Sequence, residues 1–410
     1  MRETYAKQPL SKVADVVRGK FSARPRNDPK FYGGEIPFLQ TGDIARAGRE
    51  VTSWSQTLNE LGLGVSKLFP SGTIFMSIAA NIGDVAISTF DAACPDSVVA
   101  VKPRNGVDRD WLFQSLKFAK NDLAALSTQN AQANLSLEKI EPFKIHIPPL
   151  PEQRKIAEIL RMWDQALEKL TALRAAKERR HRALTISLVF GGNRLEQFRT
   201  TGEVKPHRWF SLPASWGCTP IGKLAREVSA RNADGAQHEV LSCSKHDGFV
   251  RSLEYFKKQV FAADLSGYKK IWRGDFGFPS NHVEEGSIGI QNLTDVGVVS
   301  PIYAVFRFDP EKVDGEYAYA VLKTSLYRHI FEVSTSASVD RRGSLRWSEF
   351  SKIPFPVPTL AEQKAIAEVL RTSQADIDGL TAEIDALKQQ KRGLMQKLLT
   401  GEWPVKLEQV

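Results

Sequence analysis

The feature that most constrains this chain is a long segment that occurs twice. Residues 149–161 read PLPEQRKIAEILR, and 210 residues further on residues 359–371 read TLAEQKAIAEVLR. At this offset the match continues without a gap, so that Leu188 aligns with Leu398 and Gly191 with Gly401. Chance similarity rarely keeps one register over about 40 residues, and we therefore interpret the chain as an internal duplication.

Both copies of the repeat predict long helices. Their apolar residues recur at the alternating three- and four-residue spacing of a coiled-coil seam. The apolar seam residues are Ile156, Leu160, Trp163, Leu167, Leu170, Leu184 and Leu188 in the first copy and Ile366, Leu370, Ile377, Leu380, Ile384, Leu387, Leu394 and Leu398 in the second. Ser373 and Lys391 complete the second seam, whereas Arg174, Lys177 and His181 make the middle of the first one polar. We expect two antiparallel helices that pack on each other, and no cofactor site between them.

The segments outside the repeat differ from it in composition. Residues 1–150, the first head, and residues 194–360, the second head, are rich in glycine, proline, β-branched and aromatic residues. Short apolar runs between turn residues, such as Gly72–Ile78, Val98–Val101 and Ile302–Phe308, predict strands. One short helix is expected in each head, near residues 110–126 and 316–331.

These patterns predict an α/β (α+β) fold with an internal pseudo-twofold repeat. Two mixed, β-rich heads are expected to be separated by two long antiparallel coiled-coil helices. The predicted segments are 1–150 for the first head, 151–193 for the first spacer helix, 194–360 for the second head, 361–402 for the second spacer helix and 403–410 for a tail.

Composition narrows the compartment and the partners. The three cysteines are too few for a disulfide framework. The first residues lack the apolar core of a signal peptide, and no stretch approaches the roughly 20 apolar residues of a membrane span. We therefore expect a cytoplasmic protein without a membrane partner. The net charge of +9 permits a polyanionic partner without requiring one.

The two heads share little sequence outside the helices, and this divergence indicates a function. Two copies of one head with different surfaces are expected to bind two different versions of one kind of ligand. A helix of about 40 residues measures roughly 60 Å, which suits separated sites on a rod-like partner. Duplex DNA is the candidate partner for a basic chain, and the helices would then set the spacing between half-sites.

The doubled Glu-Gln motif also resembles a known family. The helix starts at Glu152–Gln153 and Glu362–Gln363, each after a Pro-containing segment, resemble the duplicated conserved region of the specificity subunits of type I restriction–modification enzymes. Ser211–Trp216 at the opening of the second head and Leu398–Gly401 at the end of the last helix also match. No counterpart of the Ser211–Trp216 opening precedes the first head, so we expect the N-terminus to pack differently from its counterpart.

The resemblance implies a non-catalytic subunit that binds double-stranded DNA. Each head would be a target recognition domain that reads one half-site of a bipartite target. Two methyltransferase subunits, which carry S-adenosylmethionine, and translocating restriction subunits would dock on it. The residues themselves show no catalytic constellation, and His238, Cys243 and His246 match no common zinc-finger spacing, so we expect no cofactor, metal or catalytic residue in the chain itself.

Two alternatives from other classes remain open. One is a structural adaptor whose heads bind proteins. The other is a methyltransferase or nuclease with an unrecognised active site. The sequence gives this second alternative no motif, because Pro148-Pro149 is followed by Leu150 instead of the aromatic residue that holds a flipped base, and no ATP-binding loop is present.

Polar loops of the heads supply the candidate DNA contacts, because Arg pairs with guanine and Asn or Gln with adenine. In the first head these residues are Arg24, Arg26, Lys30, Gln40, Thr41, Asn81, Gln129, Asn130 and Gln132. In the second head they are Lys245, His246, Lys269, Lys270, Arg273, Asn281, His282, Arg341, Arg342 and Arg346. The ordinary alternative for each of them is a solvated loop.

Overall fold

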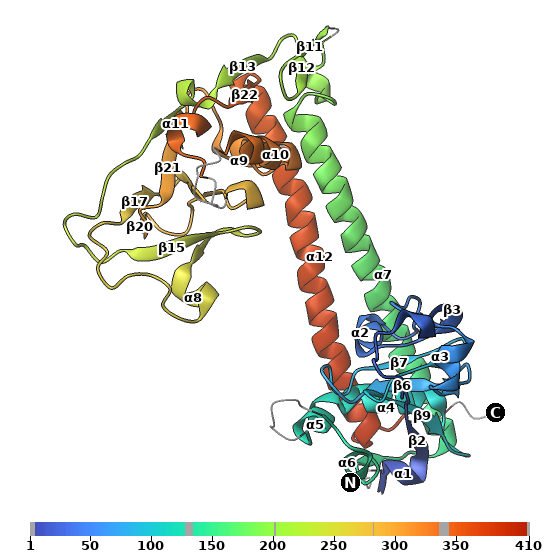
Figure 1. The fold of residues 1–410 in the computed structure, drawn as a ribbon. Helices are drawn as coiled ribbons and strands as arrows, with labels where there is room; N and C mark the ends of the chain where they lie inside the picture. Colours follow the sequence, from blue (N-terminus) through green and yellow to red (C-terminus); the bar gives the residue numbers. More distant parts are fainter. Residues whose placement is uncertain (1–4, 128–133, 201, 282, 336–343, 408–410) are drawn as a thin grey trace. The chain divides into compact units, whose positions relative to one another are not determined.

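The computed structural model describes residues 5–127, 134–200, 202–281, 283–335 and 344–407 (Figure 1). The chain forms two compact units: unit 1 comprises residues 1–173 and 380–410, and unit 2 comprises residues 174–379. Each unit therefore contains one head and part of each long helix. The segment boundaries given above stay a prediction. Within the described ranges, no helix is both long enough and apolar enough to span a membrane.

The two long helices are α7 (Leu150–Val189) and α12 (Leu360–Thr400). In unit 1 the start of α7 packs against the end of α12, because Ile156 shares a core with Leu398. In unit 2 the end of α7 packs against the start of α12, where Leu188 shares a core with Ile366. The helix segments thus run antiparallel within each unit. All the apolar seam residues named above are buried or half-buried.

Each head is built on a four-stranded antiparallel sheet of the same topology. The order in the first head is β2 (Ala14–Arg18), β9 (Val98–Pro103), β6 (Ile74–Ser77) and β7 (Val85–Ile87). The order in the second head is β14 (Ala225–Glu227), β21 (Tyr303–Phe308), β18 (Phe276–Pro279) and β19 (Gly289–Ile290). Gly72 and Gly274 precede β6 and β18 with φ of 84° and 85°, a backbone conformation that glycine adopts without strain. The duplication therefore includes the heads.

Most of the smaller strands differ between the heads. The first head adds the pairs β1 (Lys7–Pro9) with β10 (Lys144–His146), β3 (Tyr32–Pro37) with β4 (Thr57–Leu58) and β5 (Leu68–Phe69) with β8 (Ala92–Ala93). The second head adds a sheet of β16 (Gly248–Arg251), β15 (Glu239–Ser244), β20 (Val296–Val299) and β17 (Lys269–Trp272), and the pairs β11 (Val204–Pro206) with β12 (Ser211–Pro213) and β13 (Gly217–Pro220) with β22 (Pro354–Val357). The pairs β1–β10 and β13–β22 lie about 210 residues apart and correspond to each other, so the heads share the central sheet and this pair and differ in their other strands.

The expectation of one helix near residues 110–126 and one near 316–331 is wrong, because each region contains two. They are α4 (Arg109–Phe118) and α5 (Lys120–Ala125) in the first head, and α9 (Gly315–Leu322) and α10 (Ser325–Ser334) in the second. Thr324 causes the second break, since its side chain accepts a hydrogen bond from the backbone of Tyr327 and so caps a new helix. The remaining short helices are α1 (Leu10–Val13), α2 (Thr41–Arg46), α3 (Glu60–Gly64), α6 (Leu137–Ile140), α8 (Ser252–Phe256) and α11 (Trp347–Phe350).

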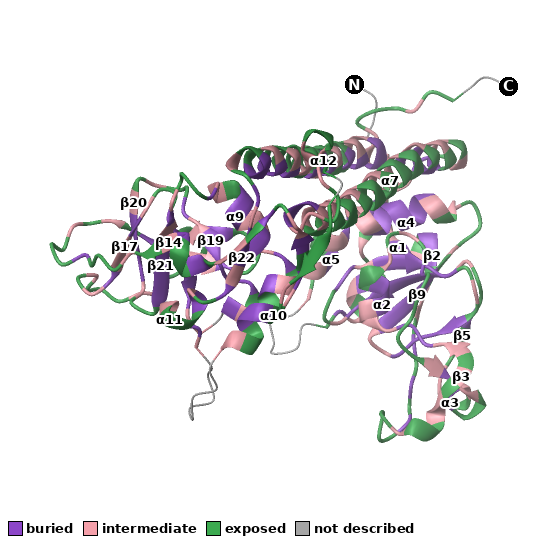
Figure 2. Cartoon of the chain, turned by 90° about the horizontal axis from the view of Figure 1, so that it is seen from above, coloured by how far each residue is buried: buried purple, intermediate pink, exposed green. Residues whose placement is uncertain are grey.

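The core of each unit lies between its central sheet, the first head helix and the long helices. In unit 1, Trp111 of α4 and Ile74 of β6 are buried with Leu160 of α7. In unit 2, Tyr317 of α9 and Phe306 of β21 are buried with Leu370 of α12. Figure 2 shows the buried residues gathered in these sheets and on the helix faces that cover them. Each head is therefore packed directly onto the long helices of its unit.

Candidate nucleic-acid interface

The glutamine of each Glu-Gln motif joins a long helix to its head. The side-chain carbonyl of Gln153 accepts a hydrogen bond from the backbone N–H of Asp108 at 2.7 Å, and Gln363 accepts one from Asp314 at 2.9 Å. Asp108 and Asp314 in turn cap the first turns of α4 and α9. Both glutamines are fully buried, so each hydrogen bond satisfies a side-chain carbonyl that has no access to water. The motif therefore fixes the same junction in both units.

The glutamate of each motif fixes the opposite long helix. In unit 2, Glu362 pairs with Arg194 through both carboxylate oxygens, at 2.7 and 2.8 Å, and accepts a hydrogen bond from Trp216 Nε1 at 3.1 Å. Arg194 follows the end of α7, so this contact ties the end of α7 to the start of α12. A bidentate Arg–carboxylate pair with one partner buried is a strong, directional link.

Tyr5 makes the corresponding contact in unit 1. Its hydroxyl donates to Glu152 Oε2 at 2.6 Å, and its ring lies against Gly401, just as Trp216 lies against Gly191. The expectation that the N-terminus packs differently is therefore wrong at this contact. The signal was present in the sequence, since Tyr5 and Trp216 are 211 residues apart, close to the repeat offset, but the two aromatic residues differ in type.

In both heads, the residue that follows the third strand of the central sheet contacts the segment before the last short helix. The strand is β6 and the helix α6 in the first head, and they are β18 and α11 in the second. The backbone N–H of Leu135 donates to the carbonyl of Ile78 at 2.8 Å, and that of Leu345 donates to Ser280 at 2.7 Å. The loop of the first head carries Asn81, which is exposed. The structure thus makes the same contact in both heads between the residue after the third sheet strand and the segment that leads to the last short helix.

In the second head, the half-buried Asn281 follows Ser280, and the exposed Arg346 follows Leu345. The remaining candidates of these segments lie outside the described residues; they are Gln129, Asn130, Gln132, His282, Arg341 and Arg342.

Three basic candidates of the first head lie on exposed loops, and two of them have acidic partners. Arg26 pairs with Asp96 at 2.6 Å and Lys30 with Asp28 at 2.9 Å. The hydrogen bond from Lys30 is the main reason why the pKa of Asp28 is below its usual value. Arg24 is exposed and donates to the backbone carbonyl before it. Exposed pairs of this kind contribute little stability, so their cations can exchange partners readily.

Gln40 and Thr41 lie at the start of α2 and are half-buried. The side-chain amide of Gln40 donates to Gln56 at 3.1 Å, and its backbone N–H donates to the buried Asp43 at 2.8 Å. This capping geometry fixes the backbone at Gln40.

Some candidate side chains of the second head are exposed to solvent, and others make contacts inside the head. Lys245 and His246 are exposed in the turn between β15 and β16. Lys269 is half-buried, and its ammonium donates to the carbonyl of Tyr303 at 2.5 Å. Burial lowers the pKa of Lys269. Lys269 therefore has a structural contact inside the second head.

Lys270 and Arg273 also have acidic partners. Lys270 pairs with Asp234 at 2.8 Å, and Arg273 pairs with Asp295 at 3.1 Å. Arg273 is exposed, whereas the side chain of Lys270 is largely covered. Of the two, Arg273 has the more accessible charge.

The sequence matches the type I restriction modification DNA specificity domain over residues 3–177 and 271–389. It is 24% identical over 342 residues to the type I restriction enzyme MjaVIII specificity subunit of Methanocaldococcus jannaschii, covering 80% of this chain and 78% of that protein. It is 36% identical over 80 residues to the type I restriction enzyme EcoKI specificity subunit of Escherichia coli strain K12, which covers 19% of this chain and 17% of that protein.

Solved structures share the fold. The S subunit of a type I restriction–modification system from M. genitalium has a TM-score of 0.53 at 14% identity, with 98% of this chain and 97% of that one covered. A chain from a structure on complex assembly and conformational transition of the type I R-M system has a TM-score of 0.58 at 15% identity, with 98% and 99% covered. The predicted fold class is confirmed, with two mixed heads and two long helices.

Proposed function

The chain belongs to the family of type I restriction modification DNA specificity domains, and from this premise we propose that it is the subunit that selects the DNA target of such a system. Each head reads one half-site of a bipartite sequence, and α7 and α12 set the spacing between the half-sites. The observation that carries the proposal is the duplicated central sheet on duplicated helix junctions, surrounded by unlike outer strands. One scaffold with two different surfaces suits two different half-sites.

The proposal assigns chemistry to partner subunits. Two methyltransferase subunits supply S-adenosylmethionine and transfer the methyl group, and restriction subunits join them for cleavage. This chain contributes binding and no catalytic residue. The names of the relatives, which are specificity subunits of restriction enzymes, support this division of labour.

Exposed loop residues are proposed to contact the DNA. We favour Asn81 and the sequence segment Gln129–Gln132 in the first head, and Arg346 with Lys245 and His246 in the second. Asn81, Arg346, Lys245 and His246 are exposed, as a base-reading side chain must be. Arg24, Arg26, Lys30 and Arg273 are better suited to phosphates, since their charges lie at the surface.

Sequencing the methylated bases of cells that express this chain with its methyltransferase subunit tests the proposal. We expect one bipartite motif that disappears when this chain is deleted. A continuous motif, or methylation that persists without the chain, would refute it. Methyl transfer by the isolated chain would support a hidden methyltransferase instead, and binding without sequence preference or salt dependence would favour a protein-binding adaptor.

A further inference from the structure

Unit 1 contains a polar cluster at the place where the first head meets both long helices. Asp164 of α7 accepts hydrogen bonds from Gln114 of α4 at 2.7 Å and from Lys391 of α12 at 2.5 Å. Lys117 of α4 lies 3.4 Å from the same carboxylate. We call Gln114, Lys117, Asp164 and Lys391 the clamp. The carboxylate of Asp164 thus links its own helix, α7, to both α4 of the head and α12.

The clamp is partly shielded from water, with the side chain of Asp164 18% exposed and that of Lys117 36% exposed. Gln114 is 2% exposed and Lys391 is 5% exposed. Burial alone would raise the pKa of Asp164, but attraction by Lys117 and hydrogen bonds from Lys391 and Gln114 lower it below its usual value. Asp164 is therefore charged at neutral pH. A buried charge that has specific partners penalises every other alignment of the elements around it, because another alignment would leave the charge unpaired.

The pseudo-symmetry of the chain identifies the corresponding place in unit 2. The long helices align at an offset of 210 residues, and α9 aligns with α4 at an offset of 206 through the capping residues Asp314 and Asp108. The positions of Gln114, Lys117, Asp164 and Lys391 correspond to Ala320, Lys323, Gln374 and His181.

No clamp forms among these described residues of unit 2. Ala320 has no polar group, and Gln374 donates to Asp378 within α12 at 2.9 Å. His181 Nδ1 lies 3.0 Å from Ser373 Oγ, so this contact joins the long helices without the head. Lys323 donates to two backbone carbonyls of the second head.

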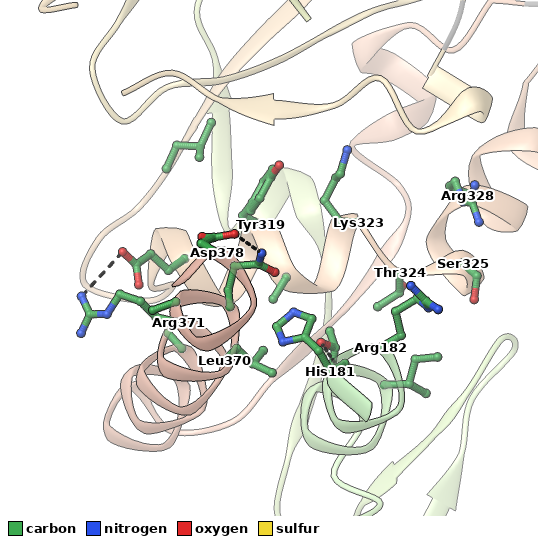
Figure 3. A pocket seen from close by; sticks show the side chains of 18 of the residues that line it. His181, Arg182, Tyr319, Lys323, Thr324, Ser325, Arg328, Leu370, Arg371 and Asp378 are labelled. Carbon is green, nitrogen blue, oxygen red and sulfur yellow. Dashed lines mark hydrogen bonds and ion pairs between the residues drawn. The ribbon is translucent and has the colours of Figure 1, made fainter. Parts of the chain in front are cut away.

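A cavity of about 650 Å³ occupies the place of the clamp in unit 2 (Figure 3). His181 of α7 and Asp378 of α12 line it from the long helices, and Tyr319 and Ala320 line it from α9. The cavity is open to solvent and lies between head and helices, whereas the clamp closes the same place in unit 1.

The second head keeps its other links to the helices. Asp314 is bonded to Gln363, as described above, and Tyr317 Oη lies 3.3 Å from the carbonyl of Val189. Arg371 and Glu316 form a further ion pair at 3.9 Å, but both side chains are more than half exposed, so this pair constrains the head weakly. The strong links are thus grouped at the Gln363 junction.

We infer that the clamp fixes the first head on the helix pair, and that the second head, which lacks it, can turn on the helices about the Gln363 junction. Asp164 is then a positioning residue. If the chain reads two half-sites, as proposed above, the first half-site has a fixed place relative to the helices and the second head adjusts to the DNA.

Distances between spin labels in the full chain test this inference without any partner. Labels are introduced as unnatural amino acids at the exposed and corresponding pairs Asn105 with Met162 in unit 1 and Glu311 with Thr372 in unit 2. We expect a narrower distance distribution for the first pair than for the second. Equal widths in the unsubstituted protein would overturn the inference.

Removing the clamp carboxylate should change the distance distribution in unit 1 alone. Asp164→Ala is expected to broaden the distribution in unit 1 and to leave unit 2 unchanged. Glu168→Gln, at an exposed position one turn further along α7, is the matched control and should change neither. An unchanged unit 1 distribution in folded Asp164→Ala protein would also refute the role of the clamp.

Transferring the clamp to unit 2 tests the inference even if Asp164→Ala does not fold. The triple variant Ala320→Gln, Gln374→Asp, His181→Lys recreates the clamp beside Lys323. We expect it to narrow the distribution between Glu311 and Thr372. A folded triple variant with the unchanged, broad distribution would contradict the inference.

The methylated motif of the assembled complex separates this inference from the proposed function. Asp164→Asn is expected to keep both half-sites but to extend methylation to more spacer lengths than the unsubstituted chain accepts. If the unsubstituted complex produces no bipartite motif, the proposed function fails. The spin-label distances then still test whether the clamp fixes the first head on the helices. The same spacer lengths in Asp164→Asn and in the unsubstituted chain would contradict the positioning role of Asp164.

Discussion

At the scale of single residues, a few buried polar side chains determine how the heads are attached. Gln153 and Gln363 have the same partners in both units, so their role survived the duplication. Glu152 and Glu362 kept their role with different partners, a tyrosine in one unit and an arginine with a tryptophan in the other. Asp164 has a role in one unit alone, because its counterpart Gln374 bonds within its own helix.

Gln153→Ala should destabilise the protein by about 1–3 kcal/mol, since it leaves the buried backbone N–H of Asp108 without an acceptor. The midpoint of urea unfolding measures this change. Gln389→Ala, at an exposed position of α12, is the control and should be nearly neutral. Equal midpoints for the two variants would show that the glutamine junction contributes no stability.

The stability that Asp164 contributes should depend on pH. Its pKa is lowered in the folded protein, so its contribution is complete above the usual carboxyl pKa and is lost as the pH falls through the lowered value. We expect Asp164→Asn to be less stable than the unsubstituted protein near pH 6, with the difference shrinking towards about pH 3. A difference that is constant in urea unfolding across this range would contradict the assignment.

At the scale of elements, the long helices combine an apolar seam with polar contacts at fixed positions. His181 meets Ser373 and Lys177 meets Asp376 in unit 2, while Asp164 meets Lys391 in unit 1. Lys177, His181, Ser373 and Lys391 are polar seam positions that the sequence indicates, whereas Asp164 and Asp376 lie next to the seam residues Trp163 and Ile377. An apolar seam alone tolerates shifts of one heptad, whereas polar seam residues specify one register.

Inserting about four residues, roughly one helical turn, into either α7 or α12 should lengthen the spacer between the two half-sites. Base-resolution methylation mapping gives the spacer length directly. The same insertion after Gly235, in an exposed loop of the second head, should leave the spacer unchanged. A constant spacer in the helix variants would show that another element sets the spacing.

At the scale of the whole molecule, each unit is assembled from distant parts of the chain. Unit 1 needs the N-terminal head and the last residues of α12, and unit 2 is formed by the middle of the chain. The central sheets have one topology, but the second head carries an additional four-stranded sheet that the described part of the first head lacks. Specificity is therefore expected to reside in what surrounds the common sheet.

Exchanging residues 194–360 for the corresponding head of a relative should change one half of the methylated motif and keep the other. The junction residues Gln363 and Glu362 lie outside the exchanged segment. The long helices therefore keep the side chains that bind the head at this junction. Retention of both half-sites after the exchange would refute the assignment of one half-site to each head.

The sequence by itself determined the duplication, the two long helices and the β-rich character of the heads, because repeat offset, heptad spacing and turn residues are local or periodic signals. The strands at Val98–Val101 and Ile302–Phe308 were predictable for the same reason, and they appear as β9 and β21. The proposed DNA contacts stay a prediction, because polar loop residues carry no periodic signal of their own.

Only the tertiary structure decided what depends on side chains that are far apart in the chain. Tyr5 reaches Glu152 across 147 residues, and Lys391 reaches Asp164 across 227. Neither contact leaves a local pattern, since each partner alone resembles an ordinary polar residue on a helix or near a terminus. The unequal attachment of the two heads follows from such contacts, because it depends on which side chains fill the space between a head and the helices.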